Sequence, residues 1–176
     1  MGRYRILIGD ITSDELLKNH DLIINPTNPQ MVAGAGVSGA IFKKAGVDTL
    51  ESYTQKEYNI NYFTDHYDQA KIMKIGDIRI TPGFGLNMDI MFVQGPKQWE
   101  YSNSLELLID TYKKLLNEAY IKGYNNILLP SIGTGEYGFE HSQIGKTVSN
   151  ILNEFTQDKE LNIDLVLYNE ADRIYY

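Results

Sequence analysis

The hydrophobic positions along the chain form short apolar runs separated by longer amphipathic segments. Runs rich in Ile, Leu and Val are typical of strands. Six such runs are expected to form strands: RYRILIG, DLIIN, AKIMKIGDIRITPG, MDIMFVQG, NNILLP and IDLVLY. Several of them are apolar at nearly every position, which indicates a sheet that is covered on both faces.

Apolar residues three and four positions apart predict helices between these strands. The clearest helix covers 102–122, and a second long helix is expected over 141–155. A shorter helix is expected over 38–45, with Gly46 as its C-cap. The segment TSDELL is typical of a helix start, with Thr12 as the N-cap of a capping box.

The alternation of strands and helices predicts an α/β fold: one domain over residues 1–176, built as a three-layer α/β/α sandwich with a mixed, mostly parallel central sheet. No repeat or linker interrupts this pattern. The polar, tyrosine-rich segment from Tyr53 to Tyr67 has no clean period, and a helix end followed by a surface loop is expected there. In sheets of this class, ligands bind among the loops at the carboxyl ends of the strands.

Composition then narrows the functional classes. The chain has 23 Asp and Glu against 16 Lys and Arg, a net charge of −7, so nucleic-acid binding is not expected. It contains no cysteine, which excludes disulfides and thiolate chemistry. The three histidines are far apart in the sequence, so no metal site is expected, and no cofactor is expected either. No apolar run reaches membrane-spanning length, and a cytoplasmic monomer is expected.

The segment PSIGTGEYGFE, between a predicted strand and a predicted helix, places Gly133, Gly135 and Gly138 close together. The glycines either make a tight turn that needs positive φ, or they free successive backbone N–H groups to bind an anion beside the helix N-terminus. Tyr137 either stacks on a ligand or covers the loop. No Gly-Lys-Ser/Thr ending follows, so a nucleotide-hydrolysing P-loop is not expected.

A second glycine loop, MVAGAGVSGAI, also opens onto a helix, and Ser38 is expected to be its N-cap. Two such loops in one small domain indicate a ligand with two phosphates, or one diphosphate clamped from both sides. Asp10 either caps the next helix or accepts from an exocyclic amine, while the Ile11 N–H donates to a ring nitrogen. Asn25 and Asn28 flank prolines, where they either support turns or, in the case of Asn28, hold a sugar hydroxyl from a stiff loop.

Five segments resemble the signatures of the macrodomain family, in the family's order and over nearly the whole chain: GDIT, NPTNPQMVAGAGVSGAIFKKAG, GDIRITPGFGL, QGP and LLPSIGTGEYGF. Macrodomains are three-layer α/β/α modules that bind ADP-ribose. The resemblance implies that Asp10 and Ile11 bind adenine, that the two glycine loops clamp the diphosphate, and that Asn28 and Tyr137 contact the distal ribose. The ligand-binding residues that it implies, with the last two bordering adenine, are Asp10, Ile11, Asn28, Gly34, Ala35, Gly36, Val37, Ser131, Gly133, Thr134, Gly135, Glu136, Tyr137, Tyr168 and Asn169.

The resemblance leaves two functions open. One is a module that binds ADP-ribose or a mono-ADP-ribosylated macromolecule. The other is a hydrolase that removes ADP-ribose from proteins or cleaves its O-acetyl or phosphate 1″-esters, with Asn28 as the candidate catalytic residue and a bound water as the nucleophile. Hydrolytic macrodomains of the common cellular type carry Asp where this chain has Ser38, and a serine hydroxyl does not replace a carboxylate base. Viral macrodomains with alanine at this position are nevertheless hydrolytic.

Overall fold

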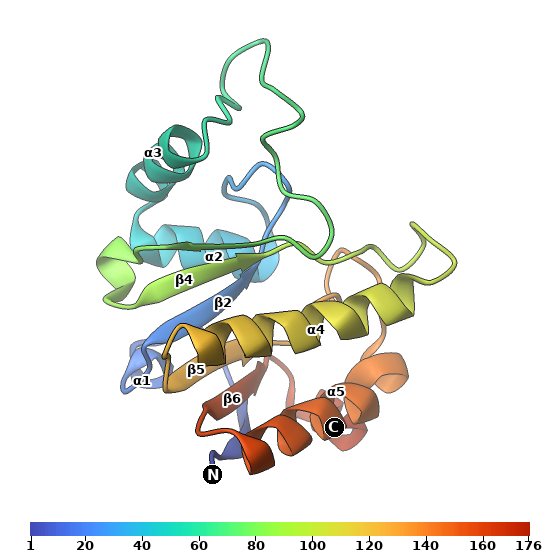
Figure 1. Cartoon of the computed structure of the whole chain (residues 1–176). Helices are drawn as coiled ribbons and strands as arrows, with labels where there is room; N and C mark the ends of the chain where they lie inside the picture. Colours follow the sequence, from blue (N-terminus) through green and yellow to red (C-terminus); the bar gives the residue numbers. More distant parts are fainter.

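The computed structural model describes residues 1–176 and contains one six-stranded sheet (Figure 1). The strands are β1 (Tyr4–Ile8), β2 (Leu22–Pro26), β3 (Ile78–Thr81), β4 (Asp89–Val93), β5 (Asn126–Pro130) and β6 (Asn162–Leu167). They lie in the order β1-β6-β5-β2-β4-β3. All neighbouring pairs are parallel except β3 and β4, so the expected mixed, mostly parallel sheet is confirmed.

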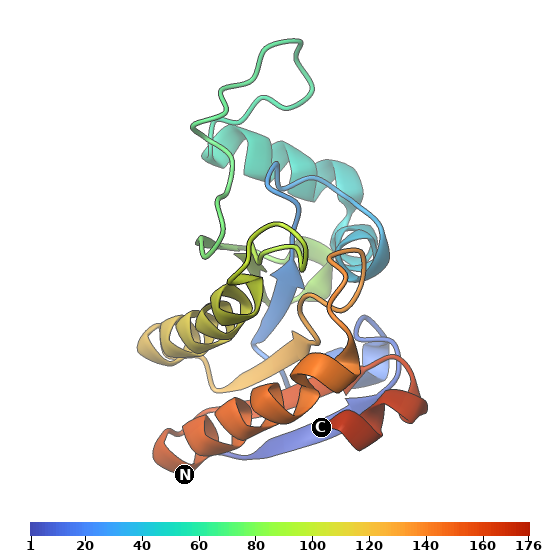
Figure 2. The same ribbon diagram turned by 90° about the vertical axis from the view of Figure 1, so that its right-hand side faces the viewer.

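Helices cover both faces of this sheet (Figure 2). The helices are α1 (Asp14–Leu17), α2 (Gly36–Ala45), α3 (Val47–Glu57), α4 (Ser104–Ile121) and α5 (His141–Asp158), with short 3-10 helices η1 (Phe84–Leu86) and η2 (Glu170–Tyr175). α4 and α5 share one apolar core with the sheet, and α2 and α3 share the other. The three-layer α/β/α sandwich is therefore confirmed. None of the helices is long and apolar enough to cross a membrane.

Several strands are apolar at nearly every position because each face of the sheet packs against one of these two cores. Along β2, Leu22 and Ile24 pack in the core under α4 and α5, while Ile23 packs in the core under α2 and α3. Successive side chains of a strand point to opposite faces, so a strand buried on both sides is apolar without alternation. Burial of these side chains from water is the main source of the fold's stability.

Two helix N-caps differ from the expectation, and one expected C-cap is confirmed. The N-cap of α1 is Ser13, whose hydroxyl accepts from the Leu16 N–H, whereas Thr12 donates to Asp10, so Thr12 as the cap is wrong. The N-cap of α2 is Ala35, and Ser38 lies inside the first turn of that helix, so Ser38 as the N-cap is wrong as well. Gly46 does end α2, and its N–H donates to a carbonyl of the last turn.

The region between α2 and β4 was predicted least well. α3 was not expected as a separate helix, because its buried face carries only one apolar residue, Leu50, beside the polar Thr54 and Gln55. The strand expected over 70–83 shortens to β3, since this segment reaches the sheet only near its end. The segment 58–73 forms a long loop that extends beyond the sheet and helices (Figure 1).

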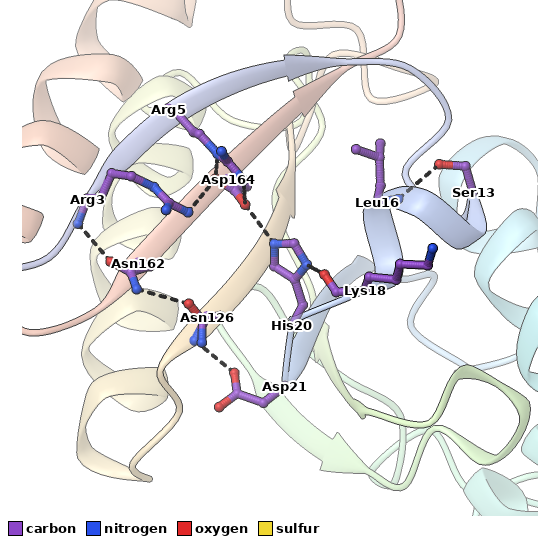
Figure 3. Close-up of polar contacts among 10 residues, drawn as sticks. All are labelled: Arg3, Arg5, Ser13, Leu16, Lys18, His20, Asp21, Asn126, Asn162 and Asp164. Atoms are coloured by element: carbon purple, nitrogen blue, oxygen red, sulfur yellow. Dashed lines mark hydrogen bonds and ion pairs between the residues drawn. The ribbon is translucent and has the colours of Figure 1, made fainter.

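A buried carboxylate, Asp164, ties β6 to β1 and to the connection before β2 (Figure 3). It accepts from Arg5 Nε at 2.7 Å and from Arg3 at 3.4 Å through Oδ1, while its Oδ2 lies 2.7 Å from His20 Nε2. The other ring nitrogen of His20 lies 2.7 Å from the Lys18 carbonyl. Both nitrogens face acceptors, so the two bonds form together only in a doubly protonated imidazole.

The surroundings of Asp164 make the free energy of unfolding depend on pH in the acidic range. Burial by itself would raise the pKa of Asp164, but the hydrogen bonds and charges of His20 and Arg5 outweigh burial and lower the pKa to about 2. A carboxyl group whose pKa is lower in the folded chain stabilises the fold above its unfolded pKa of 3.8. That contribution is lost as pH falls through the folded value, so the free energy of unfolding should decrease from about pH 4 to about pH 2.

Asp164→Asn should remove this acid-dependent contribution. At about pH 6 the free energy of unfolding of the variant should be about 3 kcal/mol lower than that of wild type, because the substitution leaves His20 and Arg5 without their buried counter-charge. Urea unfolding at about pH 6 and about pH 3 measures both effects. Asp158→Asn, at an exposed position of α5, is the matched control and should keep the wild-type profile. An unchanged pH profile in Asp164→Asn would contradict the assignment.

Candidate functional site

A cavity of about 540 Å³ opens at the carboxyl ends of β1, β2, β5 and β6. This volume lies within the range of small-molecule sites in proteins. The cavity is lined by every residue that the macrodomain resemblance implied, including Ala35 from the first glycine loop and Thr134 from the second. The two loops, about a hundred residues apart in sequence, therefore face the same space, as a clamp on one ligand requires.

The second glycine loop, residues 131–138, combines a tight turn with free donors. Gly133 and Gly138 have φ of 93° and 85°, in the left-handed region that favours glycine, and Gly138 also lies directly against the Trp99 ring. The five backbone N–H groups from Gly133 to Tyr137 donate to no group of the protein. Both readings of the glycine cluster therefore hold: the turn needs positive φ, and it leaves successive N–H groups free beside the cavity.

The interior of the protein holds this loop in place. The Tyr112 hydroxyl on α4 is fully buried and accepts from the Ile132 N–H at 2.6 Å, and burial raises the pKa of this phenol, so it stays protonated. The half-buried ring of Tyr137 lines the cavity, and its hydroxyl accepts from Gln94 Nε2 at 3.0 Å. The Lys97 ammonium lies 5.9 Å from the centre of the Tyr137 ring. Tyr137 thus covers the loop and also presents its ring to the cavity.

Asn28, in the other loop, first supports its own turn. Its Nδ2 donates to the Val32 carbonyl at 2.8 Å, and its Oδ1 accepts from the Val32 N–H at 3.2 Å. An amide nitrogen carries two hydrogens and an amide oxygen two lone pairs, so each atom retains capacity for one further bond. Because Asn28 also lines the cavity, its role in the turn is compatible with contact to a ligand.

One carboxylate oxygen of Asp10 is used in a local turn, and the other has no partner in the protein. Oδ1 accepts from both the backbone N–H and the hydroxyl of Thr12, each at 2.8 Å. Oδ2 has no partner in the protein, and neither has the Ile11 N–H. Both residues line the cavity, together with the exposed Tyr168 and Asn169 after β6. An acceptor beside a donor matches the edge of a heterocyclic base that carries an amino group.

A family model described as Macro domain matches residues 24–148, most of the chain. The chain belongs to the Macro domain family. The macrodomain is 30% identical over 181 aligned residues to a Cronobacter sakazakii protein named O-acetyl-ADP-ribose deacetylase, covering 99% of this chain and 92% of that one. A Citrobacter rodentium protein of the same name is 30% identical, covering 99% of this chain and 93% of the relative.

Solved structures agree with this assignment. The Oceanobacillus iheyensis macrodomain with ADP has a TM-score of 0.82 to this structure at 28% sequence identity, covering 98% of this chain and 87% of that chain. The Trypanosoma brucei macrodomain in complex with ADP-ribose has a TM-score of 0.76 at 20% identity, covering 99% of this chain and 67% of that chain. The second likeness shows the fold alone.

The loop that carries Asn28 in this macrodomain is held from outside by α3. Three side chains on one face of this helix bind backbone groups of the loop: Gln55 donates to the Gln30 carbonyl at 2.9 Å, Thr54 donates to the Met31 carbonyl at 2.8 Å, and Glu51 accepts from the Ala33 N–H at 2.9 Å. Residues three and four apart face the same side of a helix, which gives this spacing its effect. The polar face of α3 is therefore what positions the loop.

The loop that follows α3, which contains most of the tyrosine-rich segment, extends this outer layer together with β3. Gln55 accepts from the Tyr62 N–H at 2.8 Å while it donates to the loop, so one amide joins both segments. The Met73 N–H donates to the Pro29 carbonyl at 2.8 Å. Arg79 lies over the Tyr58 ring, 4.5 Å from its centre, and donates to the Lys71 carbonyl. The segment is thus tied by hydrogen bonds to the back of the loop that carries Asn28.

Two polar side chains lie on the α2 side of the sheet without a partner in the protein. The Asn25 amide on β2 is fully buried, and neither its Oδ1 nor its Nδ2 is paired. The Ser38 hydroxyl on α2 is 7% exposed, unpaired, and lines the cavity. Buried polar groups are nearly always hydrogen-bonded, and exceptions concentrate at functional sites. The position of Ser38 on the cavity wall fits that rule.

Two other residues of the cavity wall were not assigned a role from the sequence. His141, the first residue of α5, and Asp172, on η2, both line the cavity. The position of His141 directly after the glycine loop was a signal that could have been used. Asp172 had no such signal, because only the packing of η2 against α5 places it there.

Proposed function

We propose that this macrodomain binds ADP-ribose or ADP-ribosyl groups in the cavity. The observation that carries the proposal is the presence of two donor-rich loops on one cavity. The N–H groups from Gly133 to Tyr137 lie on one side, and those of Gly34 and Ala35, at the N-terminus of α2, lie on the other. Oriented N–H groups and a helix N-terminus bind phosphate without any nearby cation, so the chain's net charge of −7 is no obstacle.

The base of the ligand is assigned to the end of the cavity near β1. The free Oδ2 of Asp10 would accept from the exocyclic amine of adenine, and the Ile11 N–H would donate to an adjacent ring nitrogen. Tyr168 and Asn169 would border the base. The solved relative from Oceanobacillus iheyensis, which holds ADP, supports this class of ligand.

Gly135→Glu should weaken ADP-ribose binding by roughly a hundredfold or more, since the new carboxylate would repel the diphosphate at close range. A Cβ at Gly135 meets no atom within 4 Å and φ there is outside the left-handed region, so the fold should be unaffected. Calorimetric titration with ADP-ribose measures the change. The control, Gly135→Ala, adds a methyl group without charge and should stay within about threefold of wild type. Equal affinities for the two variants would refute the diphosphate assignment.

Asp10→Ala should weaken ADP-ribose binding by about tenfold and leave ribose 5-phosphate binding nearly unchanged, because only the first ligand carries adenine. Asp10→Asn keeps an oxygen for the Thr12 turn but presents an amide group to the base, so it separates the turn from recognition. Competition binding with both ligands measures the difference. If both ligands lose affinity equally, adenine does not lie at Asp10.

A second candidate function is hydrolysis of the O-acetyl ester of ADP-ribose. It is supported by the relatives named O-acetyl-ADP-ribose deacetylase, which this chain matches over nearly their full length. Water would attack the ester carbonyl, the ester C–O bond would break, and acetate and ADP-ribose would leave. Asn28 would position the distal ribose, and free N–H groups of the second loop would stabilise developing negative charge. Ser38 supplies no carboxylate base, so we expect slow turnover.

Asn28→Ala should reduce ester cleavage by roughly a hundredfold or more while ADP-ribose binding falls less, because phosphate and adenine contacts remain. Acetate release from O-acetyl-ADP-ribose measures turnover, and calorimetry measures binding. Asn28 also holds Val32, so thermal unfolding of the variant is needed to verify that it is folded. Wild-type turnover in a folded Asn28→Ala variant would exclude Asn28 from the mechanism.

A further inference from the structure

A chain of polar side chains, joined by one ion pair and two hydrogen bonds, runs along the wall of the cavity and ends on the second glycine loop. Asp172 Oδ2 lies 3.4 Å from His141 Nε2, and His141 Nδ1 lies 2.8 Å from the Tyr176 hydroxyl. The Tyr176 hydroxyl in turn lies 2.5 Å from Ser131 Oγ. Asp172, His141 and Ser131 line the cavity, whereas Tyr176 connects the last two from behind.

The carboxylate determines which hydrogen atoms this chain can carry. In a neutral imidazole one nitrogen donates and the other accepts, and a carboxylate can only accept. Asp172 therefore favours the tautomer with hydrogen on Nε2, which leaves Nδ1 to accept from the Tyr176 hydroxyl. Tyr176 has a single hydrogen, so its oxygen then accepts from Ser131. In this state the Ser131 hydrogen points toward Tyr176 and away from a ligand.

Protonation of His141 reverses the direction of the two hydrogen bonds that Tyr176 makes, while Nε2–H continues to face Asp172. With hydrogen on both ring nitrogens, Nδ1 donates to the Tyr176 oxygen, and the Tyr176 hydroxyl donates to Ser131. The Ser131 hydrogen is then free to point into the cavity. Tyr176 can only act as a switch of this kind while it keeps its hydrogen. Burial, the largest cause, raises the pKa of Tyr176 to about 12, so it does.

We propose that binding of an anionic diphosphate is coupled to protonation of His141, with Tyr176 relaying the change so that the Ser131 hydroxyl donates to the ligand. The proposal rests on the proposed function, because the anion is the diphosphate of ADP-ribose. His141 and Tyr176 are positioning residues, and Ser131 is the group that touches the ligand. The bound state takes up one proton, which the solvent supplies.

The other charged groups near His141 do not take part in this chain. η2, which packs against α5, carries Glu170 and Arg173 besides Asp172, and Arg173 Nε lies 3.8 Å from Glu170. Glu140, next to His141 in the chain, is exposed and accepts from Ser142. Asp172 is therefore the charged side chain that lies within 4 Å of the imidazole.

Calorimetry with ADP-ribose tests the coupling. Wild type should bind about tenfold more tightly at about pH 5.5 than at about pH 8, the range in which histidine side chains change charge, because a hydrogen bond to a charged phosphate is gained. Titrations at one intermediate pH, in two buffers with different heats of ionisation, should show uptake of up to one proton. Nitrogen NMR of His141 should show the Nε2–H tautomer in the free protein and the doubly protonated ring in the complex.

Tyr176→Phe is the decisive variant, since it keeps the ring and removes the relay. Ser131 is then free to donate at every pH, so the variant should lose the pH dependence and bind no more weakly than wild type at about pH 8. Ser131→Ala should bind weakly at both pH values without proton uptake. A general effect of lower protein charge would instead persist in Tyr176→Phe. The control His66→Gln removes an exposed histidine far from the cavity and should keep the wild-type slope.

The outcomes distinguish this inference from the function on which it rests. Binding of ADP-ribose by wild type with equal affinity at both pH values and no proton uptake would overturn the coupling and leave the proposed function intact. A pH slope that survives in Tyr176→Phe would overturn it as well. No binding heat at either pH would overturn the proposed function, and the coupling with it.

Discussion

The cavity depends on backbone N–H groups that the fold leaves without partners. A backbone donor inside a protein is nearly always paired, and helices and sheets exist largely to pair such donors. In the second glycine loop the bonds that shape the turn involve Ile132, Gly138 and Phe139, so the five donors between Ile132 and Gly138 stay free. A turn of this kind is stable only when neighbouring elements hold it, as the buried Tyr112 hydroxyl and the contact of Gly138 with Trp99 do here.

The first loop is held by a different device. It contains two prolines and Met31 at a φ of 57°, and its carbonyls and N–H groups bind the polar face of α3. The loop 58–73 adds bonds from the far side: the Tyr62 N–H donates to Gln55, and the Met73 N–H donates to the Pro29 carbonyl. A ligand that meets a prearranged loop does not have to order it on binding, and this reduces the entropic cost of binding. The outer layer thus contributes to the site without touching the ligand.

The polar and charged groups around Asp164 are paired within the protein, whereas several of those at the cavity are not. Asp164 on β6 is paired with Arg5 on β1 and with His20 in the connection before β2, and these contacts stabilise the fold. At the cavity, by contrast, the Ser38 hydroxyl is unpaired and Asp10 has a free oxygen. Polar groups left without protein partners are costly, so their concentration at one edge is consistent with a ligand site there.

The sequence by itself determined the fold class and the loops of the site. Strands buried on both faces lack alternation, long helices carry apolar stripes, and glycine loops follow strands, so these features are visible locally. The residues implied by the macrodomain resemblance lie in the segments that follow β1, β2, β5 and β6, and all of them line one cavity. Tertiary structure decided what depends on partners distant in the chain: Ser13 rather than Thr12 as a cap, α3 as a helix with a polar buried face, and the meeting of His141 with Asp172 and Tyr176. Such contacts leave no periodic pattern, because each is formed by single side chains that only the packing of the elements brings together.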